Sequence, residues 1–360
     1  MSGEGSAPAG VDLERLAPWL EGRVPGWRAD APVRWRLLAG GRSNVSYQLT
    51  QDDRSWVLRR PPLGHVMETA HDMSREHQVL AGLARSSFPA PRPVVLCEDQ
   101  HVIGAPFLIM EFVDARVVAD ARDAASLTAE AASEVCDALV GTLVDLHRLD
   151  VERAGLAALG RPEGYVERQV ARWRRQWAAT ASEQVPDLER LATWLQVHVE
   201  DLPAGMPWSL VHGDYRLDNV MLHHLLPQVV AVLDWEMATL GDPVCDLAVA
   251  LVYWSRPGES LRHAVPVADG VTDGPGFWSR ERLVEEYARR SGFPLDHLDL
   301  ALALACFKLA VIMESIHVRT VQGQQLGAAT ESVDMHAATL ALARLGMEVV
   351  SGAGLEGLSA

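Results

Sequence analysis

The feature that most constrains the fold of this 360-residue chain is a change in its hydrophobic pattern near residue 118. Before that point, short runs of β-branched and aromatic residues alternate with glycine, proline and paired aspartates, which is typical of strands. One segment, 71–87, instead has helical periodicity. After residue 118, long amphipathic segments surround two short apolar runs at 208–222 and 229–243. The sequence therefore predicts an α+β protein, with a small β-rich part followed by a larger helical part.

The β-rich part is predicted to contain strands at 33–50 and 55–62, and two more strands within 101–114. The proline-rich segment 86–96 is expected to be a connector, because proline cannot donate to a β-ladder. Residues 1–10 are small and polar, so they are expected to be frayed.

Helices are predicted at 125–149, 166–180, 187–202, 280–290, 298–319 and 336–350. The most apolar of them contains the chain's one lysine, Lys308, and its apolar run is too short to cross a bilayer, so we expect a core helix. The helix at 166–180 mixes arginines with Trp173 and Trp177. It is either a basic, aromatic patch for an anionic part of a substrate, such as a coenzyme A phosphate, or an amphipathic helix with its tryptophans in the core.

The composition excludes several classes of protein. A net charge of −16 argues against a general nucleic-acid binder. The four cysteines are widely spaced and form no CxxC pair, so we expect buried thiols in a reducing compartment, with neither disulfides nor zinc. The N-terminus lacks the features of a signal peptide. Together these features predict a cytoplasmic protein without a membrane or nucleic-acid partner.

Polar residues with a distinctive order occupy the run at 208–222. His212, Asp214 and Asn219 lie between apolar pairs, and Asp234 closes the next apolar run, fifteen residues after Asn219. A turn between two strands is one interpretation, since Asp, Asn and Gly are common in turns. However, Asp and Asn oxygens also suit Mg²⁺, and Asp214 is placed to accept a proton. A metal site and a base are what phosphoryl transfer requires.

This motif resembles a known family. HGDYRLDN matches the H-x-D-x-x-x-x-N catalytic loop of the protein-kinase-like fold, and its HGD form resembles the aminoglycoside-phosphotransferase branch. The segments VLDWEMATLGDPVCDLA, MEFVDARV and GRPEGYVERQVARWRRQW are similar to a narrower group, related to the N-terminal kinase domain fused to some acyl-CoA dehydrogenases. The resemblance implies a bilobal protein-kinase-like fold, with a nucleotide-binding lobe at 1–113 and a helical lobe at 114–360.

The resemblance also implies a nucleotide site in the first lobe. Its residues would be Gly41, Ser43 and Asn44 in the phosphate-covering turn, Arg59 in place of the strand lysine, Glu76 as its partner, and the hinge residues Met110, Glu111 and Val113. A plain hairpin turn and a solvated helix face are the alternatives for the turn and for Glu76. Strand alternation puts Arg59 and Arg60 on opposite faces, so Arg60 is expected to be a surface charge.

In the second lobe, the resemblance makes Asp214 the base, and Asn219 and Asp234 the Mg²⁺ ligands. Arg216 would either contact the γ-phosphate or form a surface ion pair. His212 would shape the loop, and Asp246 would accept hydrogen bonds from the loop backbone.

The implied function is Mg²⁺-dependent transfer of the γ-phosphate of ATP (or GTP) to a hydroxyl of a small molecule, with a hydroxyacyl-CoA as the preferred acceptor. An aminoglycoside or other antibiotic is the alternative acceptor. A non-catalytic pseudokinase is a second alternative, because Arg is not a neutral replacement for Lys. A third alternative is a metal-dependent phosphohydrolase that uses the His and Asp residues. The sequence leaves the acceptor, the choice between ATP and GTP, and the oligomeric state open.

Overall fold

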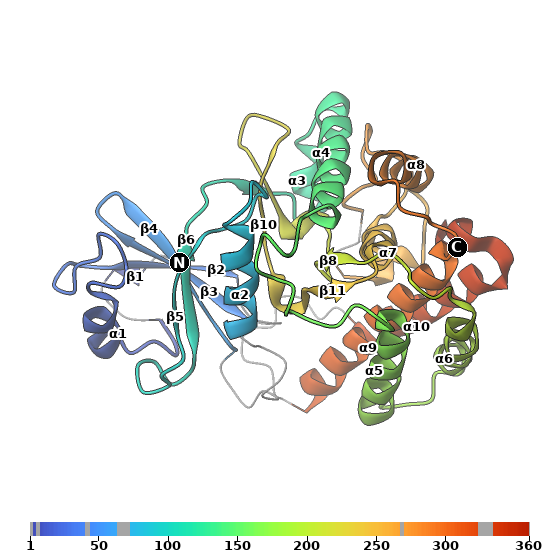
Figure 1. Cartoon of the computed structure of the whole chain (residues 1–360), viewed down its shortest axis with the longest axis horizontal. Coiled ribbons are helices and arrows are strands. Elements are labelled where there is room, and N and C mark those ends of the chain that lie inside the picture. Colours follow the sequence, from blue (N-terminus) through green and yellow to red (C-terminus); the bar gives the residue numbers. More distant parts are fainter. Residues whose placement is uncertain are drawn as a thin grey trace. The chain divides into compact units, whose positions relative to one another are not determined.

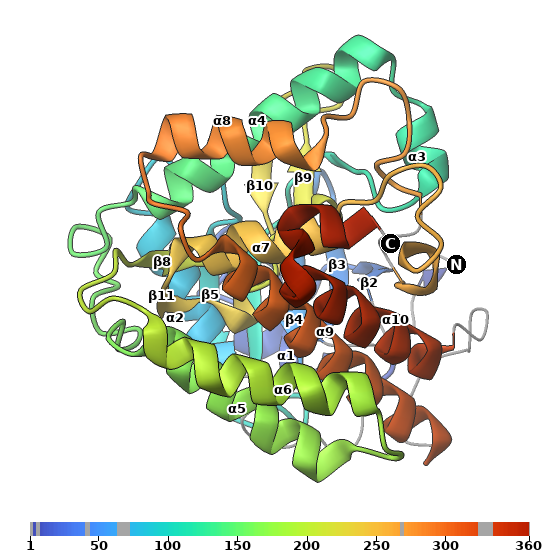
Figure 2. The same ribbon diagram turned by 90° about the vertical axis from the view of Figure 1, so that its right-hand side faces the viewer.

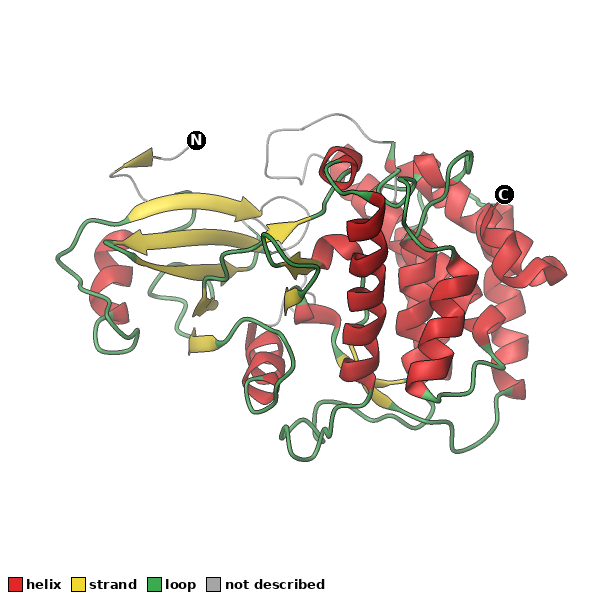
Figure 3. Cartoon of the chain, turned by 90° about the horizontal axis from the view of Figure 1, so that it is seen from above, coloured by secondary structure: helices red, strands yellow, loops and turns green. Residues whose placement is uncertain are grey.

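The computed structural model describes residues 3–4, 8–39, 44–62, 73–266, 270–322 and 334–359. Within these ranges the chain forms two compact units, one ending at Asp114 and the other beginning at Ala115 (Figure 1). The first unit is built on a β-sheet and the second is mainly helical, as Figure 3 shows by colour. The predicted α+β class is therefore confirmed.

The first unit contains one six-stranded antiparallel sheet in the order β1-β2-β3-β4-β6-β5. The strands are β1 (Gly3–Glu4), β2 (Arg34–Ala39), β3 (Val45–Gln51), β4 (Arg54–Arg60), β5 (Pro93–Cys97) and β6 (Phe107–Glu111). Helix α1 (Leu13–Leu20) packs its apolar side into a core with Trp56 and Leu58 of β4, while α2 (Met73–Leu83) packs against β5 and β6. Successive side chains of β4 point to opposite faces of the sheet, and the face that carries Trp56 and Leu58 is the one in the core with α1.

Three sequence predictions for this unit were wrong. The proline-rich segment contains strand β5, which is possible because Pro93 is the first residue of a strand at the sheet edge. Only β6 forms within 101–114, because a turn around Gly104 precedes it, and Val102 and Ile103 are apolar because they pack in the core. Residues 3–4 are not frayed but pair with β2.

The second unit places its helices around two small antiparallel sheets (Figure 2). The sheets are β10 (Val229–Val232) with β9 (Val220–Leu222) and β7 (Arg116–Val117), and β11 (Thr239–Gly241) with β8 (Ser209–Val211). The α-helices are α3 (Ala121–Ala125), α4 (Ala129–His147), α5 (Tyr165–Thr180), α6 (Pro186–His198), α7 (Pro243–Tyr253), α8 (Arg280–Ser291), α9 (Leu298–Val321) and α10 (Met335–Glu348). Helix α9 packs against α5, α6, α7 and α10, so it is the centre of this unit.

Two helical segments among the described residues are long and apolar enough to cross a membrane, 298–321 and 335–359. The most apolar part of the first is 78% buried inside the protein, so α9 is the core helix that the sequence predicts. The second is not one continuous helix, because Gly352 has a φ of +102°. On α5, Trp173 and Trp177 are buried, while several arginines are exposed, which is the packing of an amphipathic helix.

Candidate active site

The loop from His212 to Asn219 follows β8, and a buried carboxylate on α7 holds its first residues. Asp246 is 1% exposed and accepts hydrogen bonds from the backbone N–H groups of His212 and Gly213, the latter at 2.7 Å. His147 of α4 donates from Nε2 to the same carboxylate at 3.3 Å, and the hydroxyl of Tyr287 lies 2.7 Å from His147 Nδ1. These contacts connect α4, α7 and α8 to the loop.

The charge of Asp246 is stabilised by this network. Burial by itself would raise the pKa of this carboxyl, but hydrogen bonding and charge from His147, together with His212, lower it below the ordinary value for aspartate. The carboxylate is therefore ionised at neutral pH and available as an acceptor.

Both ring nitrogens of His212 form hydrogen bonds, one within the loop and one to the segment that carries Asp234. Nε2 donates to the Leu233 carbonyl at 2.7 Å, and Nδ1 accepts from the Asp214 backbone N–H at 3.2 Å. The ring also packs against Trp235, with centroids 4.6 Å apart. Because both ring nitrogens are hydrogen-bonded within the protein, neither is left to accept or donate a substrate proton. The contacts of His212 are therefore those of a residue that maintains the loop conformation.

Asp214 and Asn219 are in direct contact. The Asn219 amide nitrogen donates to the Asp214 backbone carbonyl at 2.9 Å and to its carboxylate at 3.2 Å. This leaves Asn219 Oδ1 without a hydrogen-bond partner among the described residues. The Leu233 N–H donates to the Asn219 carbonyl at 2.8 Å, which ties the segment carrying Asp234 to the loop.

Asp234 has a left-handed backbone, with φ at +66°. Aspartate tolerates this region better than most residues, because its short side chain can hydrogen-bond locally. Strained backbone of this kind concentrates at functional sites, where the surrounding structure maintains it. Asp234 lies between Leu233, whose N–H is bonded to Asn219, and the short helix Trp235–Met237.

Arg216 lies between two carboxylates. Its Nε is 3.1 Å from Asp214 Oδ2 and 3.3 Å from Asp218 Oδ1, and its guanidinium lies over the Tyr253 ring at 5.0 Å from the centroid. Burial opposes its charge, but Asp214, Tyr253 and Asp218 raise the pKa of Arg216 above its usual value. Its side chain is 17% exposed, so this is a largely buried cation and not a surface ion pair.

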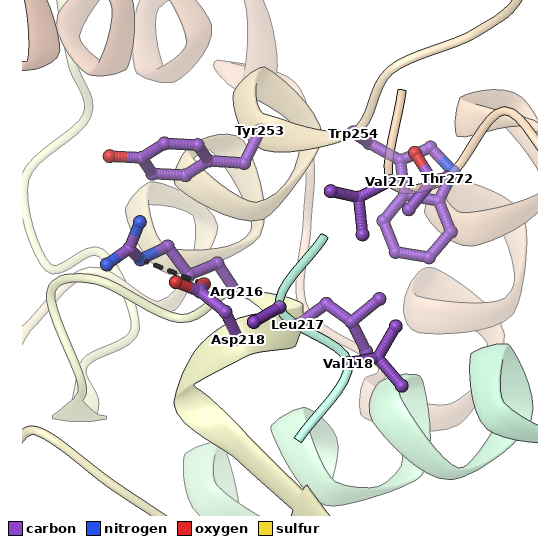
Figure 4. Close-up of a pocket in the computed structure, with 9 residues that line it drawn as sticks. Val118, Arg216, Leu217, Asp218, Tyr253, Trp254, Val271 and Thr272 are labelled. Carbon is purple, nitrogen blue, oxygen red and sulfur yellow. Dashed lines mark ion pairs between the residues drawn. The ribbon is translucent and has the colours of Figure 1, made fainter. Parts of the chain in front are cut away.

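A small cavity lies beside Arg216, on the side of Tyr253 (Figure 4). Its volume is about 20 Å³, room for roughly one water molecule. The lining residues come from the loop, from the end of α7 and from two connecting segments: Val118, Ala119, Arg216, Leu217, Asp218, Tyr253, Trp254, Val271 and Thr272. Burial raises the pKa of Asp218 to about 6, partly offset by Arg216.

The sequence did not point to Asp218 or Tyr253. Asp218 could have been found, because it is one of three acidic or amide residues in the same short motif. Tyr253 could not, because it is distant in sequence and reaches Arg216 only through the packing of α7.

In the first unit, the structure brings Arg59 and Glu76 together. Arg59 Nε lies 2.8 Å from Glu76 Oε2, and both side chains are nearly buried. Glu76 is therefore not on a solvated helix face. Asn44, immediately before β3, is 3% exposed, whereas Gly41 and Ser43 lie outside the described residues.

Arg60 is not the surface charge that we expected. It points to the opposite face from Arg59, as alternation requires, but that face is the core beneath α1, and Arg60 is 5% exposed. Its guanidinium donates to the carbonyls of Gly10, Ile103 and Pro61. The prediction was wrong because loop carbonyls around this face accept the charged group and make its burial possible.

The predicted hinge lies at the end of β6. Met110 is buried, and the backbone N–H of Glu111 already donates to the Arg92 carbonyl at 2.9 Å. The backbone N–H of Val113 has no hydrogen-bond partner in the described part of the chain. Within the described residues, the Glu111 N–H is therefore already engaged and the Val113 N–H is not, while the assignment of both residues to the hinge stays a prediction.

Replacing Arg59 and Glu76 together, as Arg59→Met with Glu76→Gln, would remove the cation without leaving an unpaired buried carboxylate. We expect nucleotide affinity to fall about 10- to 100-fold, because a hydrogen bond to a charged group contributes roughly 1.5–3 kcal/mol. Calorimetric titration with ATP measures this. Arg60→Met is the matched control: three carbonyls lose their donor, so the melting temperature should fall while affinity stays unchanged. Equal weakening of ATP binding in both variants would contradict the assignment of Arg59.

The fold of the two units and the contacts of the His212–Asn219 loop are those of the kinase-like class of phosphotransferases. Residues 34–288 match the family model described as the phosphotransferase enzyme family, and the chain belongs to that family. It is 34% identical over 318 residues to acyl-CoA dehydrogenase family member 11 of Rattus norvegicus. That alignment covers 87% of this chain but only 40% of the rat protein, so the chain spans less than half the length of this relative.

Solved structures agree with the family. A Ralstonia eutropha protein provisionally described as an aminoglycoside phosphotransferase superposes with a TM-score of 0.75 and 30% identity, over 95% of this chain and 98% of its own. Aminoglycoside phosphotransferase APH(4)-Ia, in a ternary complex with AMP-PNP and hygromycin B, shares the fold at a TM-score of 0.59 and 16% identity, over 89% of this chain and 94% of its own.

Proposed function

We propose that the protein transfers the γ-phosphate of ATP (or GTP) to a hydroxyl group of a small molecule, in a Mg²⁺-dependent reaction. The observation that carries the proposal is the placement of Asp214. Its carboxylate sits on a loop held by Asp246 and His212, in contact with Asn219 and Arg216. A fixed, partly exposed carboxylate beside a potential metal ligand and a cation suits the positioning of an attacking hydroxyl.

The residues present fit a magnesium ion. The amide nitrogen of Asn219 is bound to Asp214, so its oxygen is free to act as a ligand, and Asp234 offers a carboxylate. No group of three or more His, Cys, Asp or Glu side chains is arranged for a metal within the described ranges, so phosphate oxygens and water would complete the coordination. Bound there, Mg²⁺ would neutralise charge on the phosphates.

In the proposed reaction, the acceptor oxygen bonds to the γ-phosphorus while the bond from that phosphorus to the β–γ bridging oxygen breaks. The acceptor proton passes to a carboxylate oxygen of Asp214, and the nucleoside diphosphate leaves. Arg216, with its charge reinforced by two carboxylates, would hold Asp214 in orientation and offer its outer N–H groups to phosphate oxygens. Arg59, anchored by Glu76, would bind the other phosphates.

Two acceptor classes follow from the relatives. A hydroxyacyl-CoA is favoured by the 34% identity to acyl-CoA dehydrogenase family member 11, whose name refers to acyl-CoA chemistry. An aminoglycoside is favoured by the solved structures. A non-catalytic pseudokinase is less well supported, because Arg59 keeps a buried carboxylate partner and Asp214, Asn219 and Asp234 are all present.

Nucleotide binding is tested first, by thermal shift with ATP and GTP, each with and without Mg²⁺. A ligand at 100 times its Kd stabilises the folded state by about 2.7 kcal/mol, so the melting temperature should rise by a few degrees. Asp234→Ala should remove the Mg²⁺-dependent part of the shift. The absence of any shift with either nucleotide would count against the proposal.

Acceptor choice is then tested by labelled phosphate transfer to hydroxyacyl-CoAs and to aminoglycosides in parallel. We expect transfer to the first group and little to the second. Nucleotide hydrolysis without transfer to any acceptor would instead favour the phosphohydrolase alternative.

A further inference from the structure

The chain has one lysine among its 32 lysine and arginine residues, and this lysine is buried. Lys308 lies in the middle of α9, where neighbouring residues are small or apolar. Its Nζ donates to the backbone carbonyl of Gly213, the residue immediately before Asp214. It also lies 5.9 Å from the centre of the Trp173 ring. The loop therefore receives a contact from α9 in addition to those from α7.

A buried ammonium is costly unless something offsets its desolvation. Burial lowers the pKa of Lys308, and the charges of Asp214 and Asp246 oppose that shift. No carboxylate lies within 4.0 Å of Nζ among the residues that the structure describes. The ammonium is thus stabilised by a carbonyl, an aromatic face and two more distant carboxylates, all at the candidate active site or beside it.

The carbonyl that Lys308 binds belongs to the peptide group linking Gly213 to Asp214. The other end of the same peptide, the Asp214 N–H, donates to His212 Nδ1 at 3.2 Å. Gly213 itself has φ at +84°, and a Cβ there would approach the Met237 carbonyl oxygen to 2.9 Å. Lys308 and His212 therefore hold opposite ends of one peptide plane in a conformation that only glycine readily adopts.

A second cavity of about 20 Å³, lined in part by Lys308, lies between α5, α7 and α9. Its lining includes Tyr165, Trp173, Cys245, Asp246 and Lys308 itself. This volume is enough for about one water molecule, which could accept a remaining N–H of the ammonium.

We propose that Lys308 is a positioning residue for Asp214: its ammonium fixes the Gly213–Asp214 peptide, and through it the direction of the Asp214 carboxylate. This inference rests on the proposed phosphotransferase function. The expected consequence is a change in turnover and not in nucleotide binding, because Lys308 contacts the loop backbone.

Lys308→Met tests the inference, since methionine fills similar space without the donor. We expect kcat to fall on the order of 10²-fold, the size of effect that a misplaced catalytic group produces, with KM for the nucleotide unchanged. The melting temperature should fall by a few degrees at most, because the buried Gly213 carbonyl loses its donor. Arg319→Met removes an exposed cation from the same helix and is the control, with kcat unchanged. Lys308→Arg keeps a donor and should restore part of kcat.

Because the chain has one lysine, ¹⁵N-labelled lysine would give a single side-chain resonance from the unsubstituted 360-residue chain. We expect a slowly exchanging ammonium signal that shifts on adding Mg²⁺ and AMP-PNP. A folded Lys308→Met variant with unchanged kcat would overturn the inference. If the wild-type protein transfers no phosphate at all, the proposed function fails. The lysine resonance is a separate test: an ammonium signal that exchanges as fast as that of free lysine would overturn the buried placement of Lys308.

Discussion

Asp214→Asn is expected to reduce phosphate transfer on the order of 10³-fold while the protein stays folded and still binds nucleotide. A positioned general base contributes roughly 10²–10⁴-fold to a rate, and asparagine cannot accept the hydroxyl proton. Asparagine keeps the size of the side chain and an acceptor oxygen for Arg216, so the loop should persist. Single-turnover transfer rates, with ATP affinity measured separately, check this expectation.

The neighbouring carboxylate provides a matched control for that substitution. Asp214 and Asp218 have the same side-chain exposure, 19%, and both lie near Arg216 Nε. Asp218→Asn makes the same substitution four residues further along the loop and leaves the contact between Asn219 and Asp214 in place. Its transfer rate should fall far less. Similar losses in both variants would mean that the charge around Arg216, and not a base at Asp214, governs the rate.

Asp246→Ala is expected to lower the free energy of unfolding by about 3–5 kcal/mol and to reduce transfer strongly, because two buried N–H groups and His147 lose their acceptor. Denaturant unfolding measures the first effect. Asp242→Ala is the control on the same helix. It removes the helix cap that accepts from the Val244 N–H, worth about 1 kcal/mol, and the acceptor 2.6 Å from His297 Nε2. Stability should therefore fall here too, but the loop backbone contacts stay in place and transfer should fall far less.

The pH dependence of this difference follows from the direction of the pKa shift. The pKa of Asp246 is lowered in the folded state, so its contribution is fully present above the ordinary aspartate value of about 4. As the pH falls below that value and through the lowered pKa, protonation removes the contribution. The stability difference between the wild type and Asp246→Ala should therefore shrink only in this acidic range. A difference that already disappears between pH 7 and pH 5 would contradict an ionised Asp246.

The sequence was sufficient to predict those features that depend on residues close together along the chain. Asp214 and Asn219 lie five residues apart on one loop, so the contact between their side chains needs only that loop's backbone. Alternation on β4 was enough to put Arg59 and Arg60 on opposite faces, since the side-chain period of a strand is two. The helical pattern of α9 likewise predicted a core helix, and its burial bears this out.

The residue pattern of a strand or helix could not predict what each of its faces would contact in the folded protein. Arg60 is buried because carbonyls from Gly10, Pro61 and Ile103 converge on it, and two of these are more than forty residues away. Strand β5 forms in a proline-rich segment because an edge position tolerates Pro93. Tyr253 meets Arg216 only through the path of α7.

The sequence by itself determined the fold class, the order of the candidate catalytic residues and the opposite faces of Arg59 and Arg60, because each depends on periodicity or on short spacing. Only the tertiary structure decided what surrounds those residues. The ammonium of Lys308 reaches the carbonyl of Gly213 across 95 residues of sequence. Contacts of this kind arise from the packing of α9 against the catalytic loop, and no local pattern encodes them.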